Sequence, residues 1–199
     1  YFFLTQNKAN ELQIPKSFFQ IAIGRTRDIP NESVEDKDIS ILEKKARPTL
    51  LLSLSKTQTS FPKSLLTYIS QGVSQGLPDR PLIKQRNPWY KMEKREVPPI
   101  LFAYLGRKNS RFIINNAKVV PLTGFLCVYP EQTSKEHVIR LWSALNHPDT
   151  ITNLKLVGKS YGFGSIKVEP RGLENLPIPD HVVEKFGLVK EQQLLISKI

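Results

Sequence analysis

Positive charge is concentrated in one part of this sequence, between residues 80 and 118. The chain has 199 residues and a formal net charge of +11, and this segment alone carries ten basic and two acidic residues, a net charge of +8. Such a cationic block is typical of proteins that bind a polyanion. Trp89, Tyr90 and Phe112 are interleaved with the cations. The segment therefore has the material of a folded surface rather than of a disordered basic tail.

Length and composition place the chain among folded globular proteins. With 199 residues, of which 40% are apolar, it can bury the core of one domain or of two small ones. No stretch approaches the ~18 uninterrupted apolar residues of a membrane-spanning helix. The single cysteine, Cys127, excludes an internal disulfide, and three scattered histidines with one thiol lack the ligand spacing of a zinc site. We therefore predict neither a metal site nor a membrane partner.

The pattern of apolar residues predicts an α+β fold, with a mixed, mostly antiparallel β-sheet and short helices packed on it. Strands are predicted over residues 1–5, 18–23, 100–105, 111–114, 125–129 and 165–168. Helices are predicted over residues 38–46, 60–76, 134–147, 150–157 and, in a C-terminal tail, 180–199. The two strands that flank residues 106–110 form a predicted hairpin with cations at its tip.

Three short motifs resemble catalytic or nucleotide-binding signatures, but each lacks part of its context. Asn87-Pro88-Trp89-Tyr90 is similar to the Asn-Pro-Pro-Tyr loop of amino-group DNA methyltransferases, yet no apolar strand precedes it and tryptophan replaces the second proline. Gly158-Lys159-Ser160 ends like a P-loop, but Asn153 stands where that motif needs glycine. Gly162-Phe163-Gly164 is interpreted as a tight turn. We therefore predict no catalytic and no cofactor-binding residue in this chain.

Two alternative functions stay open from the residues alone. Asp38, Glu43 and Lys45 resemble the metal-binding carboxylates and lysine of restriction nucleases, although they fall on a predicted helix. The other alternative is a general binder of single-stranded nucleic acid, whose aromatic side chains stack on bases. Its stacking residues would be Trp89, Tyr90 and Phe112.

The central block carries long motifs in a fixed order. Residues 86–130 read RNPWYKMEKREVPPILFAYLGRKNSRFIINNAKVVPLTGFLCVYP, and residues 157–179 read VGKSYGFGSIKVEPRGLENLPIP. The motifs occur in this order: Arg-x-Pro-Trp-Tyr, a strand begun by Pro-Pro, Arg-Phe-Ile-x-Asn, Val-Tyr-Pro, a helix, Gly-x-Ser-Tyr-Gly-x-Gly and Glu-Pro-Arg. This order resembles the C-terminal target-recognition region of type II adenine-specific DNA methyltransferases of the BsuBI/PstI-like group. The resemblance extends over residues 1–179.

The resemblance implies how the parent enzyme is organised. Residues 1–179 would form a DNA target-recognition domain, as one body or as two lobes, 1–79 and 80–179, followed by the tail 180–199. Such modification methylases belong to restriction–modification systems of the prokaryotic cytoplasm. They transfer a methyl group from S-adenosylmethionine to the exocyclic amine of adenine in a short duplex site. Their catalytic domain, with its cofactor glycine motif and Asn-Pro-Pro-Tyr loop, precedes this region.

The chain itself lacks both motifs and begins without methionine, so we interpret it as a fragment. It would bind double-stranded DNA beside the upstream methyltransferase domain and hold no cofactor of its own. Phosphate contacts position such a protein, whereas contacts to base edges give sequence preference.

The predicted DNA contacts form three groups. The first group would hold phosphates or pack on the nucleic acid; its members are Lys84, Arg86, Trp89, Tyr90, Lys91 and Arg95. The second lies around the hairpin tip and would contact guanine, phosphate or adenine; its members are Arg107, Lys108, Arg111, Asn115 and Asn116. A third strip follows the glycine turn and consists of Lys159, Tyr161, Lys167 and Arg171.

Overall fold

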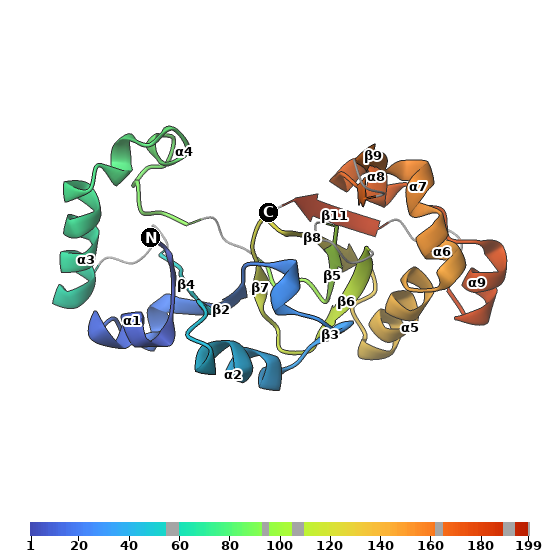
Figure 1. The fold of residues 1–199 in the computed structure, drawn as a ribbon, viewed down its shortest axis with the longest axis horizontal. Coiled ribbons are helices and arrows are strands. Elements are labelled where there is room, and N and C mark those ends of the chain that lie inside the picture. The colour runs from blue at the N-terminus through green and yellow to red at the C-terminus, as the bar shows by residue number, and fades with distance from the viewer. Residues whose placement is uncertain (55–59, 93–95, 105–109, 162–164, 189–193, 199) are drawn as a thin grey trace. The chain divides into compact units, whose positions relative to one another are not determined.

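The computed structural model describes residues 1–54, 60–92, 96–104, 110–161, 165–188 and 194–198, and the fold is α+β, as predicted. The chain divides into two compact units, whose elements are labelled in Figure 1. Unit 1 consists of Tyr1–Ala22 and Ser40–Glu96, and unit 2 of Ile23–Ile39 and Val97–Ile199. The division therefore differs from the expected lobes, 1–79 and 80–179: it falls after residue 96, and residues 23–39 belong with the C-terminal part.

Unit 1 combines short antiparallel strands with helices. β1 (Phe3–Leu4), β4 (Leu50–Leu52) and β2 (Phe19–Ile23) pair in that order. The helical elements are α1 (Gln6–Glu11), η1 (Lys16–Phe18), α3 (Lys63–Ser74), η3 (Leu77–Asp79) and α4 (Pro81–Lys84). Helix α2 (Asp36–Lys44) leads from unit 2 back into unit 1. The core of unit 1 is centred on Leu52, Leu54 and Leu65, with half-buried aromatic side chains packed around them.

Unit 2 contains a sheet in the order β11-β8-β5-β6-β3, antiparallel except for the parallel pair β3 and β6. Its strands are β3 (Ser33–Val34), β5 (Ile100–Ala103), β6 (Arg111–Asn115), β8 (Phe125–Pro130) and β11 (Leu194–Lys198). Further strands are β7 (Val120–Pro121), β9 (Lys159–Tyr161) and β10 (Ser165–Lys167). The helical elements are η2 (Thr26–Asp28), α5 (Lys135–Leu145), α6 (Pro148–Thr152), α7 (Leu154–Val157), α8 (Pro170–Glu174) and α9 (Asp180–Lys185). Across the described ranges, no helix is long and apolar enough to cross a membrane.

One face of this sheet forms the main core of unit 2. Phe102 on β5 is the Cα partner of both Phe112 on β6 and Leu126 on β8, so the three side chains share a face. All three are fully buried. Leu141 of α5 and Leu173 of α8 pack on the same cluster, so helices that follow β8 cover this face (Figure 1). Burying each such side chain contributes about 2–3 kcal/mol to folding.

A side chain completes the outer edge of β6. Strand β3 pairs with β6 only at Ile114 and Asn115, and so it does not reach Phe112. Asn146, the C-cap of α5, takes the place of a strand there: its Oδ1 accepts from the Phe112 N–H at 3.0 Å, and its Nδ2 donates to the Phe112 carbonyl at 2.8 Å. The Trp142 indole N–H donates to the same carbonyl at 3.1 Å. Hydrogen bonds as well as apolar packing therefore attach α5 to the sheet.

Most of the predicted elements are confirmed, and the differences lie in short or terminal segments. Ser134 caps α5 as expected, accepting from the His137 N–H at 3.3 Å. At the start of α3, however, Pro62 rather than Ser60 occupies the N-cap position. The sequence does not predict α1 or β4. Among the described residues of the tail, α9 is helical, whereas residues 194–198 pair with β8 as β11, so a helix through 180–199 is wrong there.

Asn115 and Asn116 are adjacent in sequence but occupy different environments. The Nδ2 of Asn115 donates to the carbonyls of Pro98 at 2.8 Å and of Val119 at 2.9 Å, and its Oδ1 accepts from the Val119 N–H at 3.0 Å. This buried amide is fully engaged inside the protein, which argues against its predicted contact with adenine. Asn116 is exposed and donates to the Glu35 carboxylate at 2.7 Å.

We expect Asn115→Ala to lower the free energy of unfolding by about 3 kcal/mol, because it leaves buried backbone groups at Pro98 and Val119 without partners. Asn116→Ala is the matched control and should change it by about 0.5 kcal/mol or less, since that amide is exposed. Urea unfolding of the two variants measures the difference. Equal effects from both substitutions would contradict the structural role of Asn115.

Candidate nucleic-acid interface

Positive charge is divided unequally between the two units. Unit 1 contains 13 basic and 5 acidic residues within 79 residues, a net charge of +8. Unit 2 contains 16 basic and 13 acidic residues, a net charge of +3. The basic block of residues 80–118 is split between them, because residues 80–96 belong to unit 1 and the rest to unit 2. Unit 1 is therefore the more strongly cationic part of the chain.

Trp89 attaches the basic segment that follows α4 to helix α3. Its indole lies over Gly72, where an added Cβ would overlap the ring, so glycine is needed for this close approach. The rings of Tyr1 and Phe2 contact the same indole, with centroid distances of 6.1 and 6.0 Å. Tyr1 also stacks on Tyr68 of α3 at 4.4 Å. The start of the chain, α3 and the basic segment thus meet in one aromatic cluster.

Tyr90 and Met92 add further attachment points to this segment. The ring of Tyr90 contacts that of Phe61 edge to face, with centroids 5.8 Å apart. The Met92 N–H donates to the Leu54 carbonyl at 3.2 Å. The Arg86 guanidinium donates to the Met92 sulfur at 3.5 Å. Because these contacts fix the backbone, the side chains of Arg86 and Lys91 project from a fixed position.

A reciprocal pair of hydrogen bonds stabilises the cluster. The Tyr68 hydroxyl donates to the Tyr1 carbonyl at 2.7 Å, and the Tyr1 hydroxyl donates to the Tyr68 carbonyl. Burial, and secondarily the neighbouring Tyr1 hydroxyl, raises the pKa of Tyr68 to about 12. The Tyr68 hydroxyl therefore remains a neutral donor at physiological pH.

The predicted phosphate-binding cations lie on and after α4. Lys84 is exposed at the last residue of α4, whereas Arg86 and Lys91 are half-buried. Arg80, which was counted in the basic block but not singled out as a contact, is exposed at the N-cap of the same helix. Pro81 directly after it, at the first helical position, is a sequence signal that could have located this helix start. Within the described part of the chain, neither Arg80 nor Lys84 has an ion-pair partner.

Trp89 and Tyr90 act as packing residues in this fold. Both side chains are half-buried, and their rings contact each other as well as neighbouring aromatic groups of unit 1. Phe112 is fully buried in the core of unit 2. A single-strand binder that stacks bases on Trp89, Tyr90 and Phe112 is therefore wrong, since Phe112 presents no ring face to solvent.

The β9–β10 hairpin displays further cations in unit 2. Lys159 and Lys167 are Cα partners across the antiparallel pair, so their side chains lie on one face, where like charges repel. Glu169 lies 3.9 Å from the Lys167 ammonium and offsets part of this repulsion. Lys159 is exposed, and Arg171 is exposed on α8. The side chain of Tyr161, predicted in the same strip, lies outside the described residues.

Arg111 braces a loop instead of pointing freely to solvent. Its guanidinium donates to the carbonyls of Asn31 at 3.4 Å, Thr26 at 3.3 Å and Ile29. Burial lowers the pKa of Arg111, while the charge of Glu32 opposes that shift. These bonds fix residues 26–31 against β6 and argue against the predicted base contact by Arg111.

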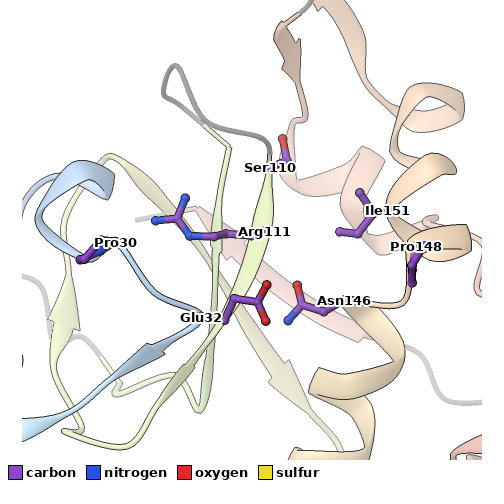
Figure 2. Close-up of a pocket in the computed structure, with 7 residues that line it drawn as sticks. All are labelled: Pro30, Glu32, Ser110, Arg111, Asn146, Pro148 and Ile151. Carbon is purple, nitrogen blue, oxygen red and sulfur yellow. The ribbon is translucent and has the colours of Figure 1, made fainter.

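Arg111 also lines a pocket of about 540 Å³ at the edge of β6 (Figure 2). Figure 2 shows the side chains of Glu32 and Asn146 pointing toward one another, with Pro148 and Ile151 on the side of α6. The Glu32 carboxylate makes this pocket a poor site for a phosphate, because the two anionic groups would repel.

The other base contacts predicted at the hairpin tip are only partly described. Arg107 and Lys108 belong to residues 105–109, between β5 and β6, and lie outside the described residues, as does Arg95. Of the hairpin residues that are described, only Asn116 remains an exposed candidate.

Asp38, Glu43 and Lys45 do not form a nuclease site. The buried Asp38 carboxylate accepts from the Glu35 N–H at 2.8 Å, the reciprocal bond of a helix capping box. Glu43 accepts from the Thr49 hydroxyl at 3.2 Å. The two carboxylates are five residues apart on α2, about 140° around the helix axis. Within the described ranges, the side chains close enough to share a metal ion do not include either of them.

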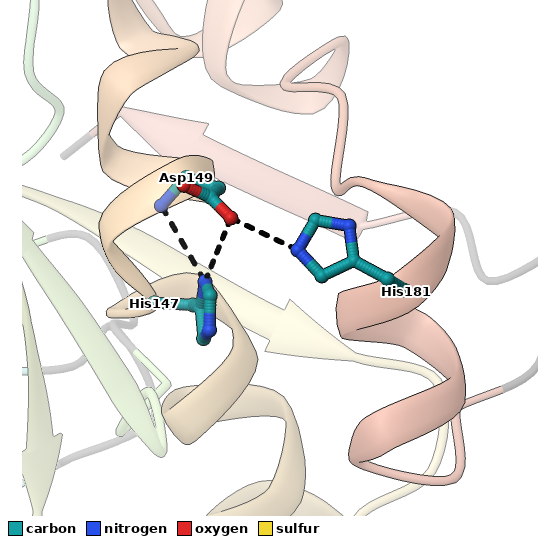
Figure 3. A group of neighbouring side chains, drawn as sticks. All are labelled: His147, Asp149 and His181. Atoms are coloured by element: carbon teal, nitrogen blue, oxygen red, sulfur yellow. Dashed lines mark hydrogen bonds and ion pairs between the residues drawn. The ribbon is translucent and has the colours of Figure 1, made fainter.

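The structure does bring together three other side chains of metal-ligand type, which no sequence pattern connects (Figure 3). The Asp149 Oδ2 lies 2.9 Å from His181 Nε2 and 3.7 Å from His147 Nδ1. The histidines come from different helical elements, 34 positions apart in sequence, so no spacing rule predicts their meeting. The histidines are scattered along the sequence, as expected, but the fold brings this pair together.

We expect Gly72→Ala to displace the Trp89 indole, because the new methyl group would overlap the ring. In a Trp142→Phe background, where Trp89 is the remaining tryptophan, its fluorescence emission should shift to the red as the indole becomes hydrated. Ser74→Ala on the exposed face of α3 is the control and should leave the emission unchanged. An unchanged spectrum in Gly72→Ala would contradict the anchoring contact.

A family model for the C-terminal domain of the type II methyltransferase M.Eco57I matches residues 1–198. The type II methyltransferase M.AccI of Acinetobacter calcoaceticus is 30% identical over 175 residues, which make up 87% of this chain and 32% of that protein. The chain thus spans about a third of the length of this relative. No solved structure matches the chain.

The resemblance to the C-terminal region of type II methyltransferases is confirmed, with a model named for M.Eco57I rather than for the BsuBI/PstI-like group. The match extends over nearly the whole chain and includes both the aromatic cluster of unit 1 and the sheet of unit 2. This chain therefore belongs to the family of C-terminal domains of M.Eco57I-type type II methyltransferases.

Proposed function

We propose that this chain is the part of a type II methyltransferase that recognises duplex DNA. The observation that carries the proposal is the net charge of +8 on unit 1, whose exposed cations Arg80 and Lys84 flank a short helix. The segment that follows is fixed to α3 through Trp89. A fixed cationic surface gains free energy from the counterions it releases on binding DNA. Family membership supports a DNA substrate over other polyanions.

The methyl transfer itself belongs to a preceding domain of the same polypeptide. That domain would bind S-adenosylmethionine and methylate the exocyclic amine of adenine, as the motif resemblance implies. The glycine-rich stretch of residues 162–164 does not fit the cofactor, because β9 and β10, which flank it, pair antiparallel. A dinucleotide-type glycine turn would instead join a strand to a helix. This chain therefore contributes binding and orientation of the DNA.

Different groups of side chains take different parts in recognition. Arg80, Lys84, Arg86, Lys91 and Arg95 hold phosphates in unit 1, and Lys159, Lys167 and Arg171 do so in unit 2. Base edges are read by Arg107 and Lys108, which connect β5 to β6, together with the exposed Asn116. Phosphate contacts of this kind fix register without sequence preference, whereas bidentate base contacts supply it.

Removing a phosphate contact should weaken binding to all duplex sequences alike. We expect Lys84→Ala, and likewise Arg80→Ala, to make the slope of log K against log salt shallower by about 0.9. Lys8→Ala is the control, because the Lys8 ammonium is already paired with Glu11 at 2.7 Å in the same unit. Fluorescence anisotropy across a salt series measures the slopes. Identical slopes for Lys84→Ala and the unmodified chain would overturn the phosphate contact.

Removing a base contact should instead change which sequences are tolerated. We expect Arg107→Ala to reduce discrimination at one base pair by about 1–3 kcal/mol, the range for a bidentate contact to guanine. Lys84→Ala serves as the comparison, since it should leave the ranking of sequences intact. Binding selection from a randomised duplex library gives the ranking for each variant. Loss of affinity without any change in ranking would assign Arg107 to the phosphates instead.

A further inference from the structure

His147, Asp149 and His181 form a compact set of metal-ligand side chains in unit 2 (Figure 3). Their ligand atoms, His147 Nδ1, an Asp149 carboxylate oxygen and a His181 ring nitrogen, all lie within 4.8 Å of one another. Figure 3 shows the Asp149 carboxylate directed toward both imidazoles. The set is independent of the basic residues proposed to bind DNA.

The geometry is close to that of a bound transition metal. Ligand bonds of about 2.0–2.1 Å in a tetrahedral site place neighbouring ligand atoms roughly 3.3 Å apart. The distances from Asp149 Oδ2, 2.9 Å to His181 Nε2 and 3.7 Å to His147 Nδ1, lie on either side of this value. The two imidazole nitrogens lie within 4.8 Å of each other, so side-chain rotations can bring all three ligand atoms to one ion.

Local structure holds His147 and Asp149 in place. His147 is the N-cap of α6, and Pro148 at the first helical position fixes the backbone that leads to Asp149. The His147 Nδ1 accepts from the Asp149 N–H at a long 3.4 Å, so its lone pair is only weakly used. Its side chain is 18% exposed, while Asp149 and His181 are 56% and 62% exposed. An ion can therefore enter from the solvent side.

The ligand types select the class of ion. Two imidazole nitrogens and one carboxylate oxygen suit zinc, iron, nickel or copper, whereas magnesium and calcium prefer oxygen ligands only. Three protein ligands leave a coordination position for water or another ligand.

We propose that His147, Asp149 and His181 bind one divalent transition-metal ion, for which zinc is the probe. The ion links α6 to α9. Asp149 on α6 and His181 on α9, which contact each other, are 32 positions apart in the sequence. In this way it fixes the helix that follows the core of unit 2. The imidazoles bind as neutral ligands, so the ion competes with protons for their ring nitrogens.

The test uses the 199-residue chain without a histidine tag, titrated with zinc chloride by calorimetry and followed by thermal unfolding. We expect one zinc per chain and a rise in Tm of several degrees at saturation, because the ion binds only the folded form. His181→Ala should weaken zinc binding at least about 10-fold and abolish the rise in Tm. Asp149→Asn should weaken it as well, and cobalt(II) in the unmodified chain should give the visible absorption of a low-coordinate site.

The matched control is Glu184→Gln, which removes an exposed carboxylate from the same helix as His181 but outside the cluster. It should bind zinc as the unmodified chain does. Because His181 is exposed, its replacement is not expected to unfold the protein, and far-UV circular dichroism verifies this. Failure of the unmodified chain to bind zinc, or equal binding by His181→Ala, would overturn the proposal. Either result leaves the proposed DNA recognition untouched.

Discussion

The close approach of the Trp89 indole to Gly72 determines how unit 1 displays its charge. A unit with 13 basic and 5 acidic residues repels itself, and apolar contacts must offset that repulsion. The aromatic cluster around Trp89 supplies such contacts at the edge of a small core. It also joins the start of the chain to α3 and to the basic segment, so packing and charge display depend on the same residues. The tryptophan that was predicted to contact DNA instead positions the cations proposed to do so.

Sequence patterns identified the elements that carry their own local signal. Ser134 before an amphipathic run predicted α5 and its cap, and the apolar run that contains Phe102 predicted a strand of the central sheet. Elements without such a signal were missed. β4 is a short run of leucines whose strand conformation depends on pairing with β1 and β2. β11 follows polar residues that favour a helix, and only its pairing with β8 makes it a strand.

The candidate site was less predictable than the fold, because side-chain environment depends on tertiary packing. Nothing local distinguishes Asn115, buried among backbone groups, from the exposed Asn116. Arg111 is an arginine beside a predicted hairpin tip, and only the fold of residues 26–31 shows that its guanidinium is occupied. The meeting of His147 and His181 depends on how α9 returns to α6. What the sequence did give was the family and the region of excess charge.

The lysine pair of the β9–β10 hairpin has a consequence for protein engineering. Lys159 and Lys167 face each other across the two strands, and Lys167 is already paired with Glu169, so an acidic residue at position 159 would replace repulsion by attraction. A screen for thermostability alone would therefore favour such a replacement, at the expense of attraction for an anionic partner. At this hairpin, robustness and affinity form a trade-off, and optimising one by directed evolution would erode the other.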